Sequence, residues 1–180
     1  MDDKTRKKLL ELARNAIINV GNEKKLSELS KQKIVEKKSG VFVSVYVDDD
    51  LRGCIGSLES IDLHEGVIRH ALLAAYRDGR FLPIMPHEFS RMKIHINILT
   101  EAKQLAFKDY KDLLKKLNKK DGYIIEKGYR KATFLPSVWE QLPKKEEFLE
   151  HLCIKAGLAP DEWKKPGMKV YNYGSKEFSE

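Results

Sequence analysis

The run VFVSVYV, residues 41–47, is the strongest constraint on what this chain can fold into. β-Branched and aromatic residues fill it, and alternate positions of a strand point to opposite faces. Four valines share one face, and Phe42, Ser44 and Tyr46 share the other. Because both faces carry apolar groups, we predict a strand in the middle of a sheet. The aspartates that follow predict a turn, so LRGCIGSL, residues 51–58, returns as the hairpin partner.

The remaining pattern predicts a mixture of helices and antiparallel strands. Apolar spacing of three and four residues predicts helices over 3–20 and 63–77, the second capped by Asp62, and alternation predicts a strand over 92–99. Further along we expect a helix near 110–117, a hairpin turning at Lys127–Gly128, a short helix in SVWEQL, a helix through FLEHLCIKAGL and a last strand in MKVYNYG. Helices and strands do not alternate regularly, which predicts an α+β fold with a mainly antiparallel sheet and flanking helices.

Length and composition narrow the class of protein. The 180 residues suit one domain, with room for two lobes, and 42% apolar residues are typical of a globular chain. The net charge of +7 comes from lysines scattered in pairs among acidic residues, which favours a solvated surface over a nucleic-acid surface. Neither cysteine belongs to a CxxC pattern, no metal-site spacing occurs, and no apolar run approaches ~18 residues. We expect a cytoplasmic protein with reduced thiols, without membrane association or a metal.

The hexapeptide LRGCIG, residues 51–56, is the first candidate site. As a strand, it places Arg52, Cys54 and Gly56 on one face. The two glycines that flank the cysteine, Gly53 and Gly56, indicate a bulge or a close approach to the backbone. Three interpretations stay open. In the first, Cys54 is a small buried residue, and the glycines make room for the Ala-rich helix. In the second, Arg52 and bare backbone N–H groups bind an anion. In the third, Cys54 is a nucleophile whose thiolate is favoured by Arg52.

A second candidate lies in RDGRF, residues 77–81. There Asp78 either pairs with an arginine in a solvated loop or is held between the guanidinium groups of Arg77 and Arg80 at the mouth of a cleft. A nucleophilic cysteine also needs a base. The available histidines stand at no diagnostic spacing from Cys54; they are His64, His70, His87 and His95.

Five motifs in order, LRGCIGSLES, AAYRDGRFLP, KIHINILTEAKQL, ATFLPSVWEQLP and FLEHLCIKAGL, resemble the AMMECR domain family. They span residues 51–158, and with the leading helix and the closing VYNYG the resemblance covers nearly the whole chain as one domain, residues 1–180. It implies an α+β fold of two unequal lobes with the hexapeptide near the cleft between them. It brings no established reaction and no cofactor. Prokaryotic members often sit in operons with a radical-SAM protein and a Memo-type protein, which are therefore candidate partners.

The resemblance singles out residues 51–56 together with Arg77, Asp78, Arg80 and Phe81. Gly79 and Leu82 stand where the family commonly has proline, which predicts a looser loop.

Our leading hypothesis is a binding cleft around residues 51–56 that takes a small anionic or polar ligand or a segment of a partner. If it is catalytic, Cys54 is the nucleophile, Arg52 the anion stabiliser, and Asp78 or a histidine the base. The residues expected to bind the ligand are Gly53, Gly56, Arg77 and Arg80. The alternative is an interaction module, either for nucleic acid or for a protein complex that docks on an exposed apolar patch near FLPIMP, residues 81–86.

Overall fold

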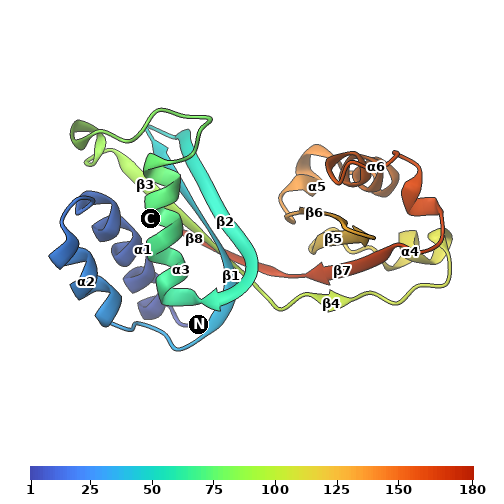
Figure 1. Cartoon of the computed structure of the whole chain (residues 1–180), viewed down its shortest axis with the longest axis horizontal. Coiled ribbons are helices and arrows are strands. Elements are labelled where there is room, and N and C mark those ends of the chain that lie inside the picture. The colour runs from blue at the N-terminus through green and yellow to red at the C-terminus, as the bar shows by residue number, and fades with distance from the viewer. The chain divides into compact units, whose positions relative to one another are not determined.

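A computed structural model describes residues 1–180, which form two compact units. The first unit comprises Met1–Leu99 together with Lys176–Glu180, and the second is Thr100–Ser175. The second unit is thus an insertion, entered after one strand of the first unit and left just before another (Figure 1). No helix has both the length and the apolar character needed to cross a bilayer.

The sheet of the first unit has the strand order β2-β1-β3-β8. Its strands are β1 (Lys38–Val47), β2 (Asp50–Asp62), β3 (Met92–Leu99) and β8 (Ser175–Ser179). The antiparallel pairing of β1 with both β2 and β3 confirms that VFVSVYV is a central strand. Asp48 and Asp49 form the two-residue hairpin turn, with φ values of 51° and 69°, the left-handed conformation that tight hairpins require.

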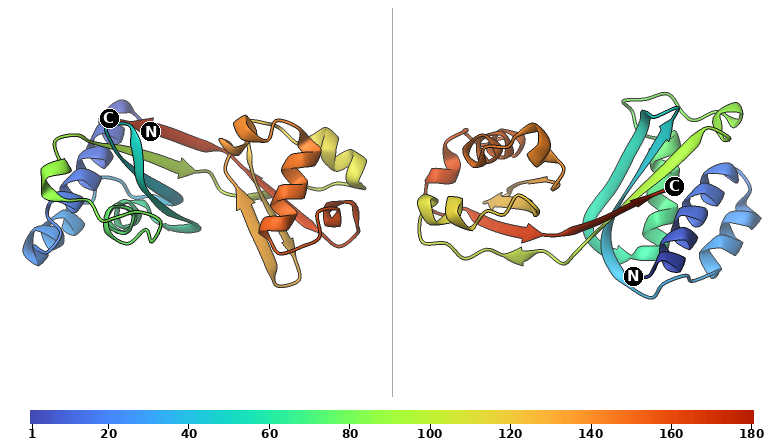
Figure 2. Two further views of the ribbon diagram at one scale, coloured as in Figure 1. Left: turned by 90° about the horizontal axis from the view of Figure 1, so that it is seen from above. Right: turned by 180° about the vertical axis from the view of Figure 1, so that it is seen from behind.

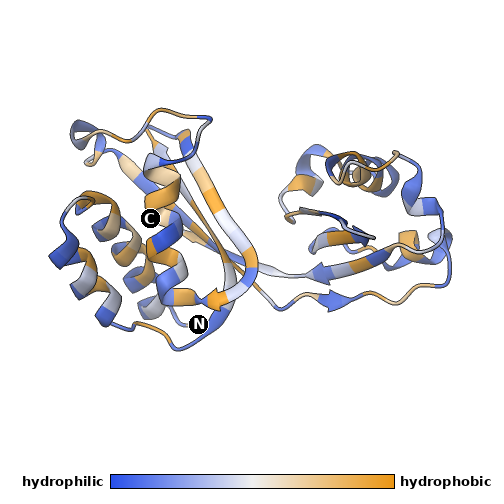
Figure 3. Ribbon diagram, viewed as in Figure 1, coloured by the Kyte–Doolittle hydropathy of each residue, from blue (hydrophilic) through white to orange (hydrophobic).

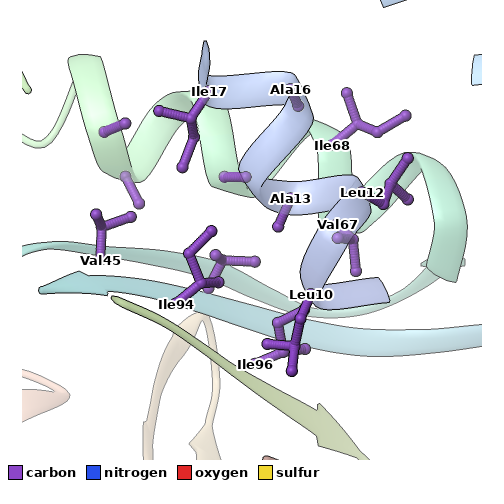
Figure 4. Close-up of a cluster of buried hydrophobic side chains, with 14 of the residues drawn as sticks. Leu10, Leu12, Ala13, Ala16, Ile17, Val45, Val67, Ile68, Ile94 and Ile96 are labelled. Carbon is purple, nitrogen blue, oxygen red and sulfur yellow. The ribbon is translucent and has the colours of Figure 1, made fainter. Parts of the chain in front are cut away.

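Three helices lie on one side of this sheet: α1 (Asp3–Ile18), α2 (Glu23–Lys31) and α3 (Leu63–Tyr76) (Figures 1 and 2). Asp62 caps α3, its side chain accepting a hydrogen bond from the backbone N–H of Glu65 at 3.1 Å. The apolar faces of α1 and α3 pack on the sheet, and residues such as Ala13, Val67 and Ile96 meet in the core (Figure 4). Figure 3 shows apolar and polar residues mixed along these helices, and most of the apolar residues of α1 and α3 are buried in the core.

The second unit has its own sheet and its own core. The strand order is β4-β7-β5-β6, and the strands are β4 (Lys103–Gln104), β5 (Gly122–Lys127), β6 (Arg130–Phe134) and β7 (Lys169–Tyr173). The helices are α4 (Tyr110–Lys116), α5 (Val138–Gln141) and α6 (Lys145–Lys155). Trp139 stacks on Phe148 with ring centroids 3.7 Å apart, and the buried face of α6 packs around this pair.

The α+β class and the antiparallel pairing are confirmed, with two four-stranded sheets where one was expected. The short strand β4 (KQ) and the strand β8 (SKEFS) were not predicted, because neither sequence has the apolar alternation of an internal strand. Tertiary contacts at the residue after β8 fix this strand. Arg14 of α1 pairs with Glu180, and the Glu180 N–H donates to the Ile94 carbonyl. The expected cleft between the lobes stays a prediction.

The close approach of β2 to α3 depends on Gly53. A Cβ atom at this position would lie 1.9 Å from the carbonyl oxygen of Ala74 and 2.7 Å from its carbonyl carbon. Both contacts are with the backbone, so no side-chain rotation can relieve them. This is the close approach that the glycines predicted, and the helix residue involved belongs to the Ala-rich face.

We expect Gly53→Ala to lower the free energy of unfolding by about 1–3 kcal/mol or more, the cost of overpacking a well-filled interior. Gly79→Ala is the matched control, since a Cβ there would meet nothing within 4 Å. Thermal unfolding followed by circular dichroism measures both variants. Equal melting temperatures for the two would contradict the close packing of β2 against α3.

Candidate functional site

A row of polar side chains crosses the face of the first sheet opposite the helices. Ser44 on β1 stands opposite Cys54 on β2 and opposite His95 on β3. The valines of β1 fill the core on the helix side, so Ser44 and its two partners lie on the other face. All three side chains are partly exposed. Residues 53–56 therefore divide between the faces as the alternation predicted, whereas the register shift at Arg52 changes the pattern for the first two residues of the hexapeptide.

The backbone of Cys54 is held on the free edge of the sheet. Its N–H donates to Asp78 Oδ2 at 2.9 Å, and its carbonyl accepts from Arg80 Nη2 at 3.3 Å. Since these groups point away from β1, Ser44 and Cys54 form a non-hydrogen-bonded pair, the kind that brings opposing Cα atoms to about 4.5 Å. The thiol and the Ser44 hydroxyl are thus near neighbours.

Asp78 and Arg80 form a clamp on this edge. Arg80 Nε and Nη2 donate to Asp78 Oδ1 and Oδ2 at 2.9 and 2.7 Å, a two-point pair that fixes both groups. The hydrogen bonds from Arg80 hold the pKa of the buried Asp78 carboxyl well below its usual range. A carboxylate so strongly stabilised is a weak base, so the geometry favours Asp78 as a positioning residue over the predicted base.

Arg52 is engaged elsewhere. Its guanidinium donates to the Glu88 carboxylate and to the Leu82 carbonyl, and Glu88 Oε2 also accepts the N–H of Met85 at 2.8 Å. Arg52 lies at a register shift between β1 and β2, where Val45 opposes Gly53 and the next residue opposes Leu51. This is the predicted bulge. The bulge directs Arg52 towards the loop after α3, where its guanidinium is already paired. This arrangement does not favour Arg52 as the anion stabiliser.

His95 is the histidine that shares the face of Cys54. Its ring packs on Tyr46 with centroids 4.6 Å apart, and its Nδ1 lies 3.7 Å from Glu177 Oε1. Burial raises the pKa of Tyr46, and nearby Cys54 and Glu177 add to this shift. Tyr46, Ser44 and Glu177 were not predicted as site residues, although the alternation of VFVSVYV already placed the first two on one face.

The other candidate residues lie away from the row. His64 is buried on α3, where its Nε2 lies 2.9 Å from the Leu29 carbonyl, and His70 is buried on the same helix. Both are core histidines.

His87 is exposed in the loop after α3, and Arg77 is exposed at the C-cap of that helix without a partner for its side chain. The Arg80 guanidinium lies over the Phe81 ring, with its central carbon 5.2 Å from the ring centroid.

Packing accounts for both glycines of the hexapeptide. Gly53 faces the backbone of α3, and a Cβ on Gly56 would lie 2.3 Å from the ring of Phe42, its partner on β1. Phe42 thus covers Gly56 from the open side of the sheet. Packing alone therefore explains why both positions are glycine, and no ligand is needed to account for them.

The two cysteines have opposite environments. Cys153 is fully buried in the core of the second unit, and burial raises the pKa of its thiol to about 11. Cys54 is partly exposed, and its role as a packing residue stays a prediction. No group of three His, Cys, Asp or Glu side chains in the structure is arranged to hold a metal.

We expect a thiol reagent such as Ellman's reagent to react with one thiol in the native protein and with two after unfolding. The native reaction belongs to Cys54, so Cys54→Ser should remove it and Cys153→Ser should leave it unchanged. Because Cys153 is fully buried and burial raises the pKa of its thiol to about 11, it should stay unreactive at pH 9 while the protein is folded. The folded state keeps Cys153 neutral, so its contribution to stability is lost as the pH rises from 9.0 to about 11.

Comparison with known proteins agrees with this fold and with the motifs. The family model AMMECR1 matches residues 10–178. Protein MK0488 of Methanopyrus kandleri is 37% identical over 96% of this chain and 86% of its own length. Protein MJ0810 of Methanocaldococcus jannaschii is 36% identical over 93% of this chain and 86% of its own. The crystal structure of the uncharacterized protein PH0010 from Pyrococcus horikoshii superposes with a TM-score of 0.80 at 31% identity, over 100% of this chain and 93% of that one. The chain belongs to the AMMECR1 family.

Proposed function

We propose that the row Cys54–Ser44–His95 is a thiol site that binds a small ligand with an electrophilic carbon. The observation that carries the proposal is the register of three strands, which aligns a thiol, a hydroxyl and an imidazole on one open face. The Glu177 carboxylate is 3.7 Å from His95 Nδ1, a distance for an ionic contact with a protonated imidazole and beyond hydrogen-bond range. A nucleophile and a base are two of the parts that covalent catalysis needs.

Neighbouring strands lie about 4.8 Å apart, so Cys54 and His95 are separated by two strand spacings, about 10 Å. That distance excludes a direct hydrogen bond. It leaves room for the Ser44 hydroxyl to pass a proton between them, from the Cys54 thiol to Nε2 of His95. The sulfur would then bond to a carbonyl carbon of the ligand, and the electron pair of the broken π bond would move to the carbonyl oxygen.

Arg80 is the residue placed to stabilise negative charge at this site. Its hydrogen bond with Asp78 raises its pKa most, and the nearby Cys54 adds to the shift. The Arg80 side chain is 61% exposed, although its guanidinium already holds Asp78 and the Cys54 carbonyl. Arg80 therefore replaces Arg52 in the proposal as the group that favours a thiolate or an oxyanion.

We expect Arg80→Gln to slow alkylation of Cys54 at pH 7 by about three- to tenfold, because a positive charge near the reacting sulfur is lost. Iodoacetamide labelling followed by mass spectrometry measures the rate, and buried Cys153 does not contribute. Arg77→Gln is the matched control, since it removes the same charge from an exposed residue of the same segment.

Equal alkylation rates in the two arginine variants would contradict a stabilising role for Arg80 at Cys54. Cys54→Ser is a second check, because the backbone bonds to Asp78 and Arg80 do not need sulfur. Its free energy of unfolding should stay within about 0.5 kcal/mol of the parent value. A large loss would return Cys54 to a packing role.

A second function, as an interaction module, is supported by the loop after α3. Leu82 is 79% exposed and Met85 is 52% exposed, and the segment FLPIMP has two prolines that limit its freedom. Exposed apolar side chains on a stiff loop are typical of a protein contact. The radical-SAM and Memo-type proteins of the operons are the partners we propose for it.

We expect the double variant Leu82→Ser/Met85→Ser to lose co-purification with these two proteins when all three are co-expressed. The control is Tyr129→Ser/Ile154→Ser, which removes two other exposed apolar side chains, 91% and 54% accessible. Retained co-purification of the first variant, or equal losses in both, would rule out this loop as the docking site.

A further inference from the structure

A pocket of about 530 Å³ lies wholly within the second unit. It forms where β4 and β7 stop pairing. Gln104 opposes Tyr171, and the Leu105 N–H still donates to the Val170 carbonyl at 2.8 Å. Beyond that bond the two segments separate, and residues 105–110 and 163–169 line the space between them. The volume is within the range of small-molecule sites, about 300–1,000 Å³.

The charge of the pocket is positive and comes from lysine alone. Four lysines line it, against the single acidic residue Asp109; they are Lys108, Lys164, Lys165 and Lys169. Lys165 is paired with Glu162, and Lys169 lies 3.6 Å from Glu126. Lys108 and Lys164 have no carboxylate partner, and Lys164 stands over the Trp163 ring, 5.0 Å from its centroid. Asp109 is engaged as the N-cap of α4.

Two aromatic rings meet at the wall of the pocket. Tyr110 and Trp163 are in edge-to-face contact with centroids 6.0 Å apart. Tyr110 is 37% exposed, whereas Trp163 is 1% exposed. The indole N–H of Trp163 is buried and has no hydrogen-bond partner. A buried donor left unpaired is costly, and the other tryptophan is satisfied, since Trp139 Nε1 donates to the Asp121 carbonyl at 2.9 Å.

We propose that this pocket binds a small organic phosphate that carries a flat ring, such as a nucleoside monophosphate. Lysine ammonium groups bind phosphate as point charges, whereas planar carboxylates favour the two-point geometry of arginine, which the pocket lacks. Lys108 and Lys164 would hold the phosphate, and the exposed ring of Tyr110 would take the flat group, while the Trp163 ring forms part of the wall beside it. This site is independent of Cys54 and of the function proposed above.

The indole N–H groups provide a test that needs no enzymatic activity. The chain has two tryptophans, so a ¹H–¹⁵N spectrum shows two indole signals, which a Trp139→Phe variant assigns. We expect AMP to shift the Trp163 signal in a saturable way and to leave the Trp139 signal in place. Adenosine and inorganic phosphate should each bind about tenfold more weakly or worse, because each offers only half of the contacts.

The variant Lys108→Gln/Lys164→Gln should weaken AMP binding about tenfold or more. The control Lys119→Gln/Lys120→Gln loses the same charge from exposed lysines of the same unit outside the pocket, and should bind AMP as the parent does. Equal affinities of the two double variants would overturn the proposal, as would an unchanged Trp163 signal at about 1 mM AMP. Binding of a single-stranded oligonucleotide without any response to AMP would also overturn it, in favour of a surface that follows a nucleic-acid backbone.

Discussion

The approach of α3 to the edge strand β2 is the contact on which the candidate site depends. Gly53 lets the Ala74 carbonyl come within a distance that any side chain would forbid. The helix therefore ends beside β2, and the chain leaves it next to the free edge of the strand. Asp78 follows the C-cap Arg77 directly, so its carboxylate reaches the Cys54 N–H without a long loop. An edge strand with unpaired N–H and C=O groups invites pairing with another chain, and here Asp78 and Arg80 occupy those groups at Cys54.

Local pattern predicted most of the first unit, because its signals are strong and its contacts are between neighbours in sequence. The alternation of VFVSVYV, the Asp62 cap and the isoleucines of β3 each predicted an element that the structure contains. The division into two sheets could not be predicted, since nothing in the run from β3 to β4 marks a change of sheet. The polar strand β8 was missed for the same reason: its place beside β3 is set by tertiary contacts at Arg14 and Ile94.

The sequence singled out Cys54 and His95 of the candidate site but missed Ser44 and Glu177, and it did not predict how the arginines are engaged. Sequence spacing brought Arg52 and Cys54 to one face, yet the bulge turns Arg52 towards Glu88, and Arg80 from a distant segment takes its place near the thiol. A bulge depends on register, which a single strand does not reveal. Likewise, four histidines were equivalent in the sequence, and only the pairing of β1 with both neighbours selects His95. Gly79 and Leu82 predicted a loose loop, but the two-point pair of Asp78 with Arg80 fixes the part nearest Cys54.

From Arg52 to Gly56, packing or a side-chain contact explains every residue of the hexapeptide except Cys54. Ile55 packs into the core, Gly53 admits α3, Gly56 lies under Phe42, and Arg52 ties β2 to the loop through Glu88. At position 54 the fold uses only the backbone, whose N–H and C=O any residue supplies. Serine or alanine would keep those two bonds. The Ser44 hydroxyl and the His95 imidazole, in register beside position 54, are the basis of the role that we propose for sulfur there.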